Sequence, residues 1–510
     1  MQAKQYLKPV ENGVRALCLR QIESLLQTMT FTSLTFLLFF PLVFFLYWRK
    51  PEQRWQNGIL VLASYFFYGW WDYRFCALMM LSSLVDYFIG IAVHETEDNR
   101  KRRSYLFFSL FCNLGLLGYF KYYNFFSDSL GTFLSQFGWT VHPVIAEVIL
   151  PVGISFYTFQ TLSYTIDIYR GKLEPTRNLI DYLAFVSFFP QLVAGPIERA
   201  TNLIPQFAVK REFSGSEAAE GCRQILWGFF KKLVIADRLA ISVDAAYNNP
   251  GDASELSLII ATIFFAFQIY CDFSAYSDIA IGTAKMFRIN LMRNFAYPYF
   301  SQSVTEFWRR WHISLSTWFR DYVFIPLGGS RCSTSRVCFN MMVTFVLSGL
   351  WHGAAWKFII WGAINGAALV IEKLAMIKRS ESDVPGGAEQ RPSGSVLLRM
   401  AYTFTVICTG WVFFRAASSM DACLILYKIV QLPLALTNPE AFSIGGEMKN
   451  GLAPLLVFVL IEWIQRRHPH PVVMSSWPKV YRWSAYTLIF WITLGQMQTT
   501  RVNPFIYFTF

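Results

Sequence analysis

The stretch FNMMVTFVLSGLWHGAAWKFIIWGAINGAALVI, residues 339–371, is long enough and apolar enough for two membrane-spanning helices. One ionisable imidazole, His352, lies in the middle of it. A charged group at membrane depth costs about 2.5 kcal/mol or more, whereas a neutral imidazole costs less and is the form that a general base requires. The neighbouring Gly349 and Gly353 either let two backbones approach closely or leave room for a substrate. The stretch therefore predicts a membrane protein in which His352 is either a functional group or a histidine hydrogen-bonded between helices.

The whole chain has the composition of a polytopic membrane protein. Of its 510 residues 54% are hydrophobic and only 15% are charged, and its 17 Trp and 25 Tyr suit the aromatic belts at the two membrane surfaces. Apolar runs of spanning length occupy residues 31–47, 57–71, 76–93, 105–120, 146–169, 180–195, 222–244, 256–271, 338–372, 397–414, 451–465 and 484–498. Because some runs are short or interrupted by proline, we expect an all-α integral membrane protein with about ten to twelve spans and additional re-entrant or interfacial helices.

The net charge of +12 sets the orientation of the spans and does not indicate nucleic-acid binding. The basic loops YWRKPEQR (47–54) and NRKRR (99–103) are expected to face the cytoplasm. A flexible cytoplasmic loop is predicted at about 377–395, because this segment is rich in Gly, Pro and Ser. With an interfacial helix at 421–433, the count of spans places the C-terminus on the outer face.

Cysteine and histidine spacing gives no indication of a metal or a bound cofactor. The nine Cys form no CxxC pair, and the six His form no HxxxH pair. Residues 1–28 have neither the apolar core of a signal peptide nor that of a span, and they would place four basic residues outside. Our hypothesis is therefore an N-terminal extension over 1–28 with translation beginning at Met29, followed by a single transmembrane domain over 29–510.

A second polar segment is VTEFWRRWHISLSTWFRDYVFIPLGGSR, residues 304–331. If it forms one helix, a single face carries Arg309, His312, Ser316 and Arg320. Glu306 and Arg310 are then in i,i+4 register. The arginines either anchor the segment at the lipid headgroups or bind phosphate or carboxylate.

Two further segments combine polar and apolar residues in a way that bears on function. In QIYCDFSAYSDIAIG (268–282), Asp272 and Asp278 interrupt an apolar helix, and they either orient a catalytic imidazole or tie helices together, with the second role favoured. The terminal RVNPFIYFTF (501–510) contains an F-x-Y-x-x-F pattern centred on Tyr507. Taken alone, this tail is typical of an interfacial aromatic anchor.

The residues around both histidines closely resemble the membrane-bound O-acyltransferase family. The resemblance rests on EFWRRWHISLSTWFRDYVFIPLGG (306–329) and FVLSGLWHGAAWKFIIWGAINGA (345–367). Residues 151–171, 188–200 and 270–282 are also similar to the bacterial branch that contains the alginate O-acetyltransferase membrane subunit. The likeness runs from about Met29 to Phe510, with no counterpart for residues 1–28 or the loop around 380–395.

The resemblance implies a fold and a reaction. His352 corresponds to the family's defining active-site histidine and His312 to its second active-site position. A ring of spans and re-entrant helices would enclose a central tunnel open to both faces of the bacterial inner membrane. Acetyl-CoA would be the donor substrate, and the acetyl group would leave outward for an exported polysaccharide of the alginate type. The implied partner is a periplasmic Ser-His-Asp acetyltransferase of the SGNH type.

Two assignments remain our own inferences beside the resemblance. Arg309, Arg310 and Arg320 are candidates for holding the phosphates of CoA, on the basis of their charge. Tyr507 is a candidate acyl relay, because a small membrane partner in the D-alanylation system ends in a similar F-x-Y-x-x-F.

Three other functions are compatible with the sequence. One is transfer of D-alanyl or another acyl group from a carrier protein. A transporter or flippase would use the intramembrane His and Asp as a proton relay. A structural subunit of a polysaccharide export complex would need no catalytic histidine at all.

Overall fold

Every regular element that the computed structural model describes is a helix. The described residues are 29–139, 149–375, 393–434, 437–470, 472–474, 476–499 and 505–506. The tail residue Tyr507, the proposed N-terminal extension 1–28 and most of the predicted loop 377–395 therefore lie outside the description.

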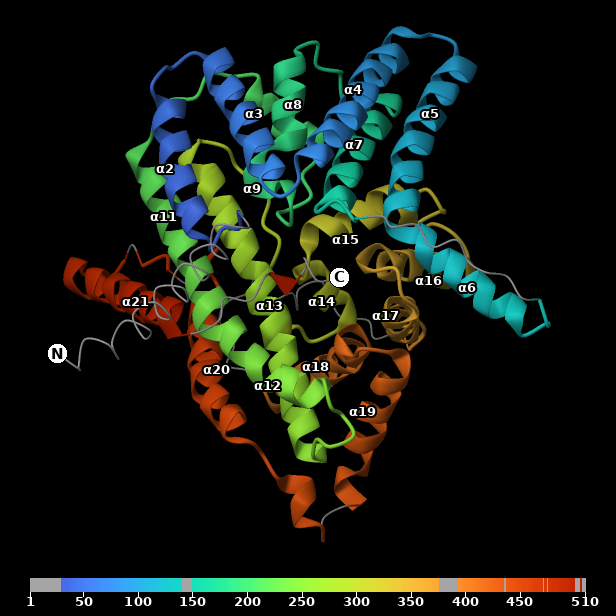
Figure 1. The fold of residues 1–510 in the computed structure, drawn as a ribbon, viewed down its shortest axis with the longest axis vertical. Coiled ribbons are helices and arrows are strands. Elements are labelled where there is room, and N and C mark those ends of the chain that lie inside the picture. Colours follow the sequence, from blue (N-terminus) through green and yellow to red (C-terminus); the bar gives the residue numbers. More distant parts are fainter. Residues whose placement is uncertain are drawn as a thin grey trace, which may run out of the picture.

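The N-terminal third forms the upper part of the molecule in Figure 1. Its elements are α2 (Leu34–Trp48), α3 (Gln53–Gly69), α4 (Tyr73–Glu95), α5 (Asn99–Leu117), the π-helical turn η1 (Gly118–Tyr122), α6 (Tyr123–Ser135), α7 (Ile154–Tyr169), α8 (Leu179–Ser187), α9 (Phe189–Leu192) and α10 (Ala200–Phe207). Several of these helices begin at a residue whose side chain accepts a hydrogen bond from a backbone N–H of the first helical turn. Ser33 accepts from the backbone N of Phe36 at 3.2 Å, and Asp72 accepts from that of Arg74 at 2.9 Å.

The middle of the chain forms the axis of the fold. Its elements are α11 (Gly215–Phe230), the π-helical segment η2 (Lys231–Ala236), α12 (Asp237–Tyr247), α13 (Glu255–Met286), the 3₁₀ turn η3 (Pro298–Phe300), α14 (Val304–Arg310), α15 (Ile313–Phe319), the π-helical turn η4 (Arg320–Phe324), α16 (Thr334–His352) and α17 (Trp356–Leu374). In Figure 1, α11, η2 and α12 form one long helix that runs beside α13. These two rods pack closely because glycines face each other: a Cβ added to Gly221 would lie 2.5 Å from the carbonyl oxygen of Gly282.

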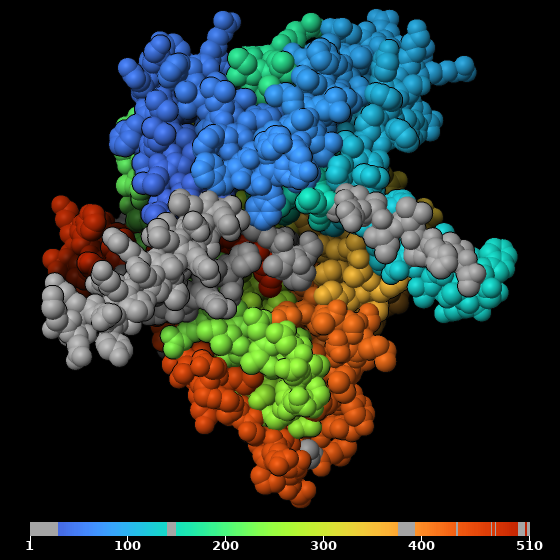
Figure 2. All heavy atoms as spheres, in the orientation of Figure 1, coloured from blue at the N-terminus to red at the C-terminus, as the bar shows by residue number. Residues whose placement is uncertain are grey.

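The C-terminal helices complete the lower part of the molecule. They are α18 (Gly394–Arg415), α19 (Ser419–Gln431), the 3₁₀ turns η6 (Leu432–Leu434) and η7 (Pro439–Phe442), α20 (Gly446–Gln465) and α21 (Lys479–Thr499). Figure 1 shows α6 and α21 projecting to opposite sides. On the face in Figure 2, the first helices cover the upper half, and segments of α12, α13, α18 and α19 cover much of the lower half.

The helices have the composition of a membrane protein. Three of them, α4, α13 and α18, are long and apolar enough to cross a membrane. The outer helix α2 exposes large apolar side chains, with Leu38 67% and Phe45 71% exposed, as expected of a surface that faces lipid. The apolar run 338–372 forms two helices, α16 and α17.

The prediction of one helix over the start of 304–331 is wrong. The segment forms α14, α15 and η4, with a break at Trp311 and His312. The break occurs because the preceding irregular segment, residues 290–297, provides backbone partners: Ala296 N donates to Arg310 O and Ile313 N donates to Asn294 O, both at 2.9 Å. A tertiary contact thus overrides the local helical pattern.

The apolar run 180–195 is also interrupted. It forms the short helices α8 and α9, which are separated at Phe188, where φ is −47° and ψ is 103°. Each helix is too short to cross a bilayer by itself. Phe188, Phe189 and Gln191 are all buried, so the break is packed against protein. Irregular backbone of this kind is tolerated at membrane depth only under such cover.

Candidate active site

The backbone places His312 at the start of α15 in a left-handed conformation. Its φ is 43° and its ψ is 54°, a region that non-glycine residues rarely occupy. Asn294 braces the turn, because its Oδ1 accepts from Ser314 Oγ at 3.0 Å and from Ser314 N at 3.3 Å. Such a conformation costs roughly 1–3 kcal/mol and persists where the surroundings enforce it, often at functional sites.

His352 is the last residue of α16, and the packing of α17 fixes the end of that helix. A Cβ on Gly349 would lie 2.1 Å from the carbonyl oxygen of Phe358, and a Cβ on Gly353 would lie 2.1 Å from the Phe358 ring. Both glycines therefore permit the close approach of Phe358 on α17 to the end of α16.

The fold brings the two histidines together although they are 40 residues apart in the sequence. Their ring centroids lie 6.4 Å apart at an interplanar angle of 53°. His312 is 1% exposed and His352 is 6% exposed. Two imidazoles at this separation can both reach a reacting group that lies between them.

Aromatic rings enclose the histidine pair. The Phe273 ring lies 4.6 Å from that of His312, and Trp361 and Phe414 lie 5.0 and 5.3 Å from His352. Trp351 contacts both, at 6.0 and 5.1 Å. A surrounding of this kind excludes water and strengthens electrostatic interactions inside the site.

Both histidines line a cavity of about 560 Å³, a volume suited to a substantial organic ligand. Ser316 and Arg320 of the α15–η4 segment also line it, together with Arg309 at the end of α14. Four residues that the sequence places on one helical face, Arg309, His312, Ser316 and Arg320, therefore line one cavity. The break between α14 and α15 does not separate them. The remaining cavity wall is mainly apolar, with contributions from Trp308, Phe345 and others.

The three arginines differ in their surroundings. Arg309 and Arg320 are exposed residues that line the cavity, and Nε of Arg320 contacts Asp321 at 2.8 Å. Arg310 is instead paired with Glu306 at 2.7 Å, as its i,i+4 spacing predicts. Arg310 is not among the residues that line the cavity described here.

The two aspartates of α13 lie in a neighbouring layer of buried ion pairs. Asp272 Oδ1 accepts from Nζ of Lys232 at 2.6 Å, and the same Nζ lies 2.8 Å from Asp237. Asp278 pairs with Lys231 at 2.6 Å, and Ser274 accepts from Lys231 at 2.7 Å. These bonds tie α13 to the π-helical segment η2, in the manner of the structural role favoured from the sequence.

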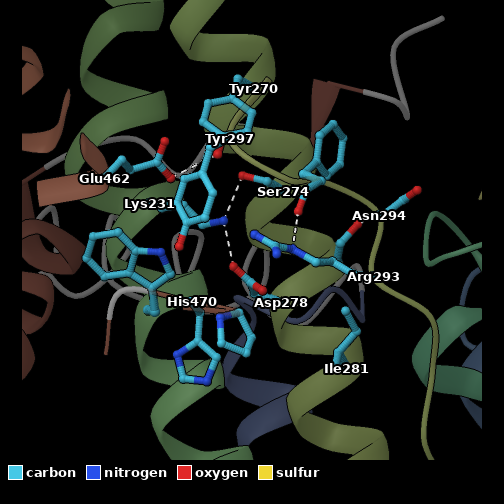
Figure 3. Close-up of a pocket in the computed structure, with 14 residues that line it drawn as sticks. Lys231, Tyr270, Ser274, Asp278, Ile281, Arg293, Asn294, Tyr297, Glu462 and His470 are labelled. Carbon is cyan, nitrogen blue, oxygen red and sulfur yellow. Dashed lines mark hydrogen bonds and ion pairs between the residues drawn. The ribbon is translucent and has the colours of Figure 1, made fainter. Parts of the chain in front are cut away.

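Asp278 and Lys231 border a small polar cavity of about 20 Å³, shown in Figure 3. Glu462 and His470 approach it from the other side, and Glu462 accepts from the hydroxyl of Tyr270 at 2.9 Å. The volume suits a single water molecule and not an acyl donor. Figure 3 shows these polar side chains gathered around the cavity, with Lys231 bonded to Ser274 and Asp278 of α13.

Two residues of the C-terminal segment, Phe505 and Ile506, are described, and both are buried. Phe505 is 2% exposed and Ile506 is 9% exposed, which contradicts the expectation of an anchor at the membrane surface for these residues. The Phe505 ring lies 5.0 Å from Tyr276 and 4.8 Å from Nζ of Lys232. The backbone N of Ile506 donates to Asp272 Oδ2 at 2.5 Å.

Sequence reasoning missed the lysines of η2 and the cation near His352. Lys231 and Lys232 stand within the apolar run 222–244, six and five residues before Asp237, and cations at membrane depth are a recognisable signal of function or pairing. Lys121 follows the apolar run 105–120 directly and looks from the sequence like a residue at the membrane surface. Only the fold shows that its ammonium lies beside the end of α16.

Comparison with known proteins places these motifs in context. Residues 169–381 match the model of the membrane-bound O-acyltransferase family. A probable alginate O-acetylase of Pseudomonas putida is 38% identical over 506 residues, covering 94% of this chain and 100% of that protein. A probable alginate O-acetylase of Azotobacter vinelandii is 44% identical, with 76% and 75% covered. A peptidoglycan O-acetyltransferase of Helicobacter pylori is 35% identical, with 73% of each chain covered.

Proposed function

The chain belongs to the membrane-bound O-acyltransferase family and is an O-acyltransferase, and from this premise we propose that it passes acetyl groups across the membrane to an exported polysaccharide. The observation that carries the proposal is the buried pair His312 and His352 on one cavity. The names of the relatives, which acetylate alginate or peptidoglycan, support acetyl as the group and a glycan as the acceptor.

The proposed reaction uses His352 as the general base. The imidazole takes the proton of an acceptor hydroxyl while the oxygen of that hydroxyl attacks the thioester carbonyl of acetyl-CoA. The C–S bond breaks, an ester forms, and the CoA thiolate leaves and takes up a proton. His312 positions the donor or stabilises the developing oxyanion. Trp351, Phe273 and other aromatic residues enclose both imidazole rings. This enclosure supports the proposed reaction, because it protects the thioester from hydrolysis.

Acetyl-CoA is proposed as the donor, delivered from the cytoplasm. Arg309 and Arg320 line the histidine cavity and carry charge suited to the phosphates of CoA. Arg310 is a weaker candidate because it is not among the residues that line this cavity. No bound cofactor is needed for this chemistry, since the thioester itself is activated.

We further propose that Tyr507 relays the acetyl group. Tyr507 directly follows Ile506, whose backbone is bound by Asp272, and the next residue of α13, Phe273, contacts the His312 ring. Ile506 is thus bound to α13, the helix whose Phe273 contacts the His312 ring. A periplasmic SGNH-type acetyltransferase with a Ser-His-Asp triad would then transfer the group to the polysaccharide.

The proposed setting is the bacterial inner membrane. We propose about ten to twelve spans, with the interrupted segments α8–α9 and α14–α15 as re-entrant elements around a tunnel. Their short lengths and buried breaks support this arrangement.

Label transfer tests the reaction and the relay together. Inverted membrane vesicles receive acetyl-CoA labelled in the acetyl group, and alkali-labile label on the protein is measured. We expect label on the wild type, none on His352→Ala, and none on Tyr507→Phe. Tyr481→Phe, which changes an exposed tyrosine of α21, is the matched control and should keep the label.

The outcomes separate the parts of the proposal. Label that survives Tyr507→Phe would reject the relay, and label that survives His352→Ala would reject the catalytic role of the histidine. Label that appears only with an acylated carrier protein would reject acetyl-CoA as the donor.

A further inference from the structure

The π-helical turn η1, residues Gly118–Tyr122, joins α5 to α6 and lies beside the end of α16 (Figure 1). Insertions of this kind in a helix occur frequently at functional sites, because they redirect side chains that a regular helix would place elsewhere. Two consecutive residues of the turn, Lys121 and Tyr122, reach the helix that carries His352.

These two side chains bind three consecutive carbonyl groups. The hydroxyl of Tyr122 donates to Leu350 O at 3.0 Å. Nζ of Lys121 donates to Trp351 O at 2.5 Å and lies 3.4 Å from His352 O. The same ammonium donates to Ser155 Oγ of α7 at 3.3 Å, so it links three separate elements.

The end of α16 needs such partners. The last carbonyl groups of a helix receive no hydrogen bond from a backbone N–H of that helix. A cation near them is favoured by the helix dipole. After His352 the chain leaves the helix at Gly353, where φ is −165° and ψ is 152°. The backbone of His352 is therefore not held by a following helical turn, and the donors from η1 add to the packing of α17 in holding it.

We propose that Lys121 and Tyr122 are positioning residues that hold the terminal turn of α16 and so fix the imidazole of His352 relative to His312. The inference rests on the proposed function, in which His352 is the general base. Lys121 contributes the larger part, because its ammonium binds the carbonyls of Trp351 and His352, which flank the Cα of His352. A misplacement of about 1 Å can lower a rate by about 100-fold without changing the reacting groups.

The structure supplies a matched control for the lysine. Nζ of Lys428 on α19 also binds backbone carbonyls, those of Pro250, Gly251 and Ala253, at 3.3, 2.8 and 2.6 Å. It is far from the histidine motif in the sequence and does not line the histidine cavity. Lys428→Met therefore removes a comparable set of bonds without affecting the end of α16.

The test measures release of CoA thiol from acetyl-CoA by inverted membrane vesicles, over a range of acetyl-CoA concentrations and at matched protein levels. We expect Lys121→Met to lower kcat by about 10- to 100-fold with KM for acetyl-CoA within about twofold of the wild type. Lys121→Arg, which restores the charged donor, should recover part of the lost kcat. Tyr122→Phe should lower kcat less than Lys121→Met, and Lys428→Met should leave it unchanged.

Three results would overturn the inference. These are an unchanged kcat in Lys121→Met, an equal loss in Lys428→Met, and a loss expressed only in KM, which would make Lys121 a donor-binding residue. His352→Ala, assayed in parallel, separates this inference from the proposed function. If His352→Ala is inactive while Lys121→Met is fully active, only the positioning role is rejected. If His352→Ala is active, the proposed function itself fails.

Discussion

At the scale of single residues, the two histidines differ in how their backbones are held. His352 ends a regular helix, whereas His312 lies in a left-handed conformation that Asn294 and its neighbours enforce. The left-handed region is tolerated by asparagine but is strongly disfavoured for β-branched residues. The backbone at position 312 therefore limits which residues can replace the histidine.

Replacing His312 should separate the backbone requirement from the chemistry. His312→Asn should fold normally, because asparagine tolerates the conformation, and it should lower activity without abolishing it, because Asn occupies this position in some members of the family that the sequence resembles. His312→Val should in addition lower the melting temperature, through a destabilisation of about 1–2 kcal/mol. Thermal unfolding of the purified protein in one detergent measures the difference. Ile313→Val, at an ordinary helical position, is the control, and equal melting of the Asn and Val variants would contradict the account.

At the scale of elements, the close contact of α16 and α17 determines where His352 lies. Gly349 permits the approach of Phe358, and Gly362 of α17 permits the reciprocal approach of Phe345, whose carbonyl oxygen would lie 2.3 Å from an added Cβ. Small residues at such contacts allow two helices to pack backbone to backbone.

Gly349→Ala should force these two helices apart. The added methyl group would lie 2.1 Å from the Phe358 carbonyl oxygen, so we expect overpacking to cost about 1–3 kcal/mol and to lower acetyl transfer. Gly115→Ala is the matched control, because a Cβ there meets nothing within 4 Å. Thermal unfolding and the vesicle assay check both variants. Wild-type activity and stability in Gly349→Ala would show that the contact is not needed.

At the scale of the whole molecule, the sequence predicted the elements better than their connections. Long apolar runs such as 397–414 became helices, since apolar composition and length alone specify them. The break at His312 was not predictable, because it depends on backbone bonds to Asn294 and Ala296, which come from a different segment.

The candidate site shows the same division. His312 and His352 could be chosen as candidate site residues from their motifs. Their proximity in space could not be predicted, because residues 40 apart in the sequence have no shared helical face. The pairing of Asp272 with Lys232 and the burial of Phe505 likewise depend on the packing of η2 and α13. Contacts between elements that are distant in sequence leave little trace in local periodicity.

The most direct test of the account measures alkali-releasable acetate on envelope and secreted glycans of cells that acetylate a glycan through this protein. Wild type and His352→Ala are compared at matched membrane levels, with His470→Ala as the control, since His470 is also buried but lines the other cavity. The account predicts that acetate is lost in His352→Ala and kept in His470→Ala. Unchanged acetate in His352→Ala would contradict it and would make the imidazole a helix-packing residue.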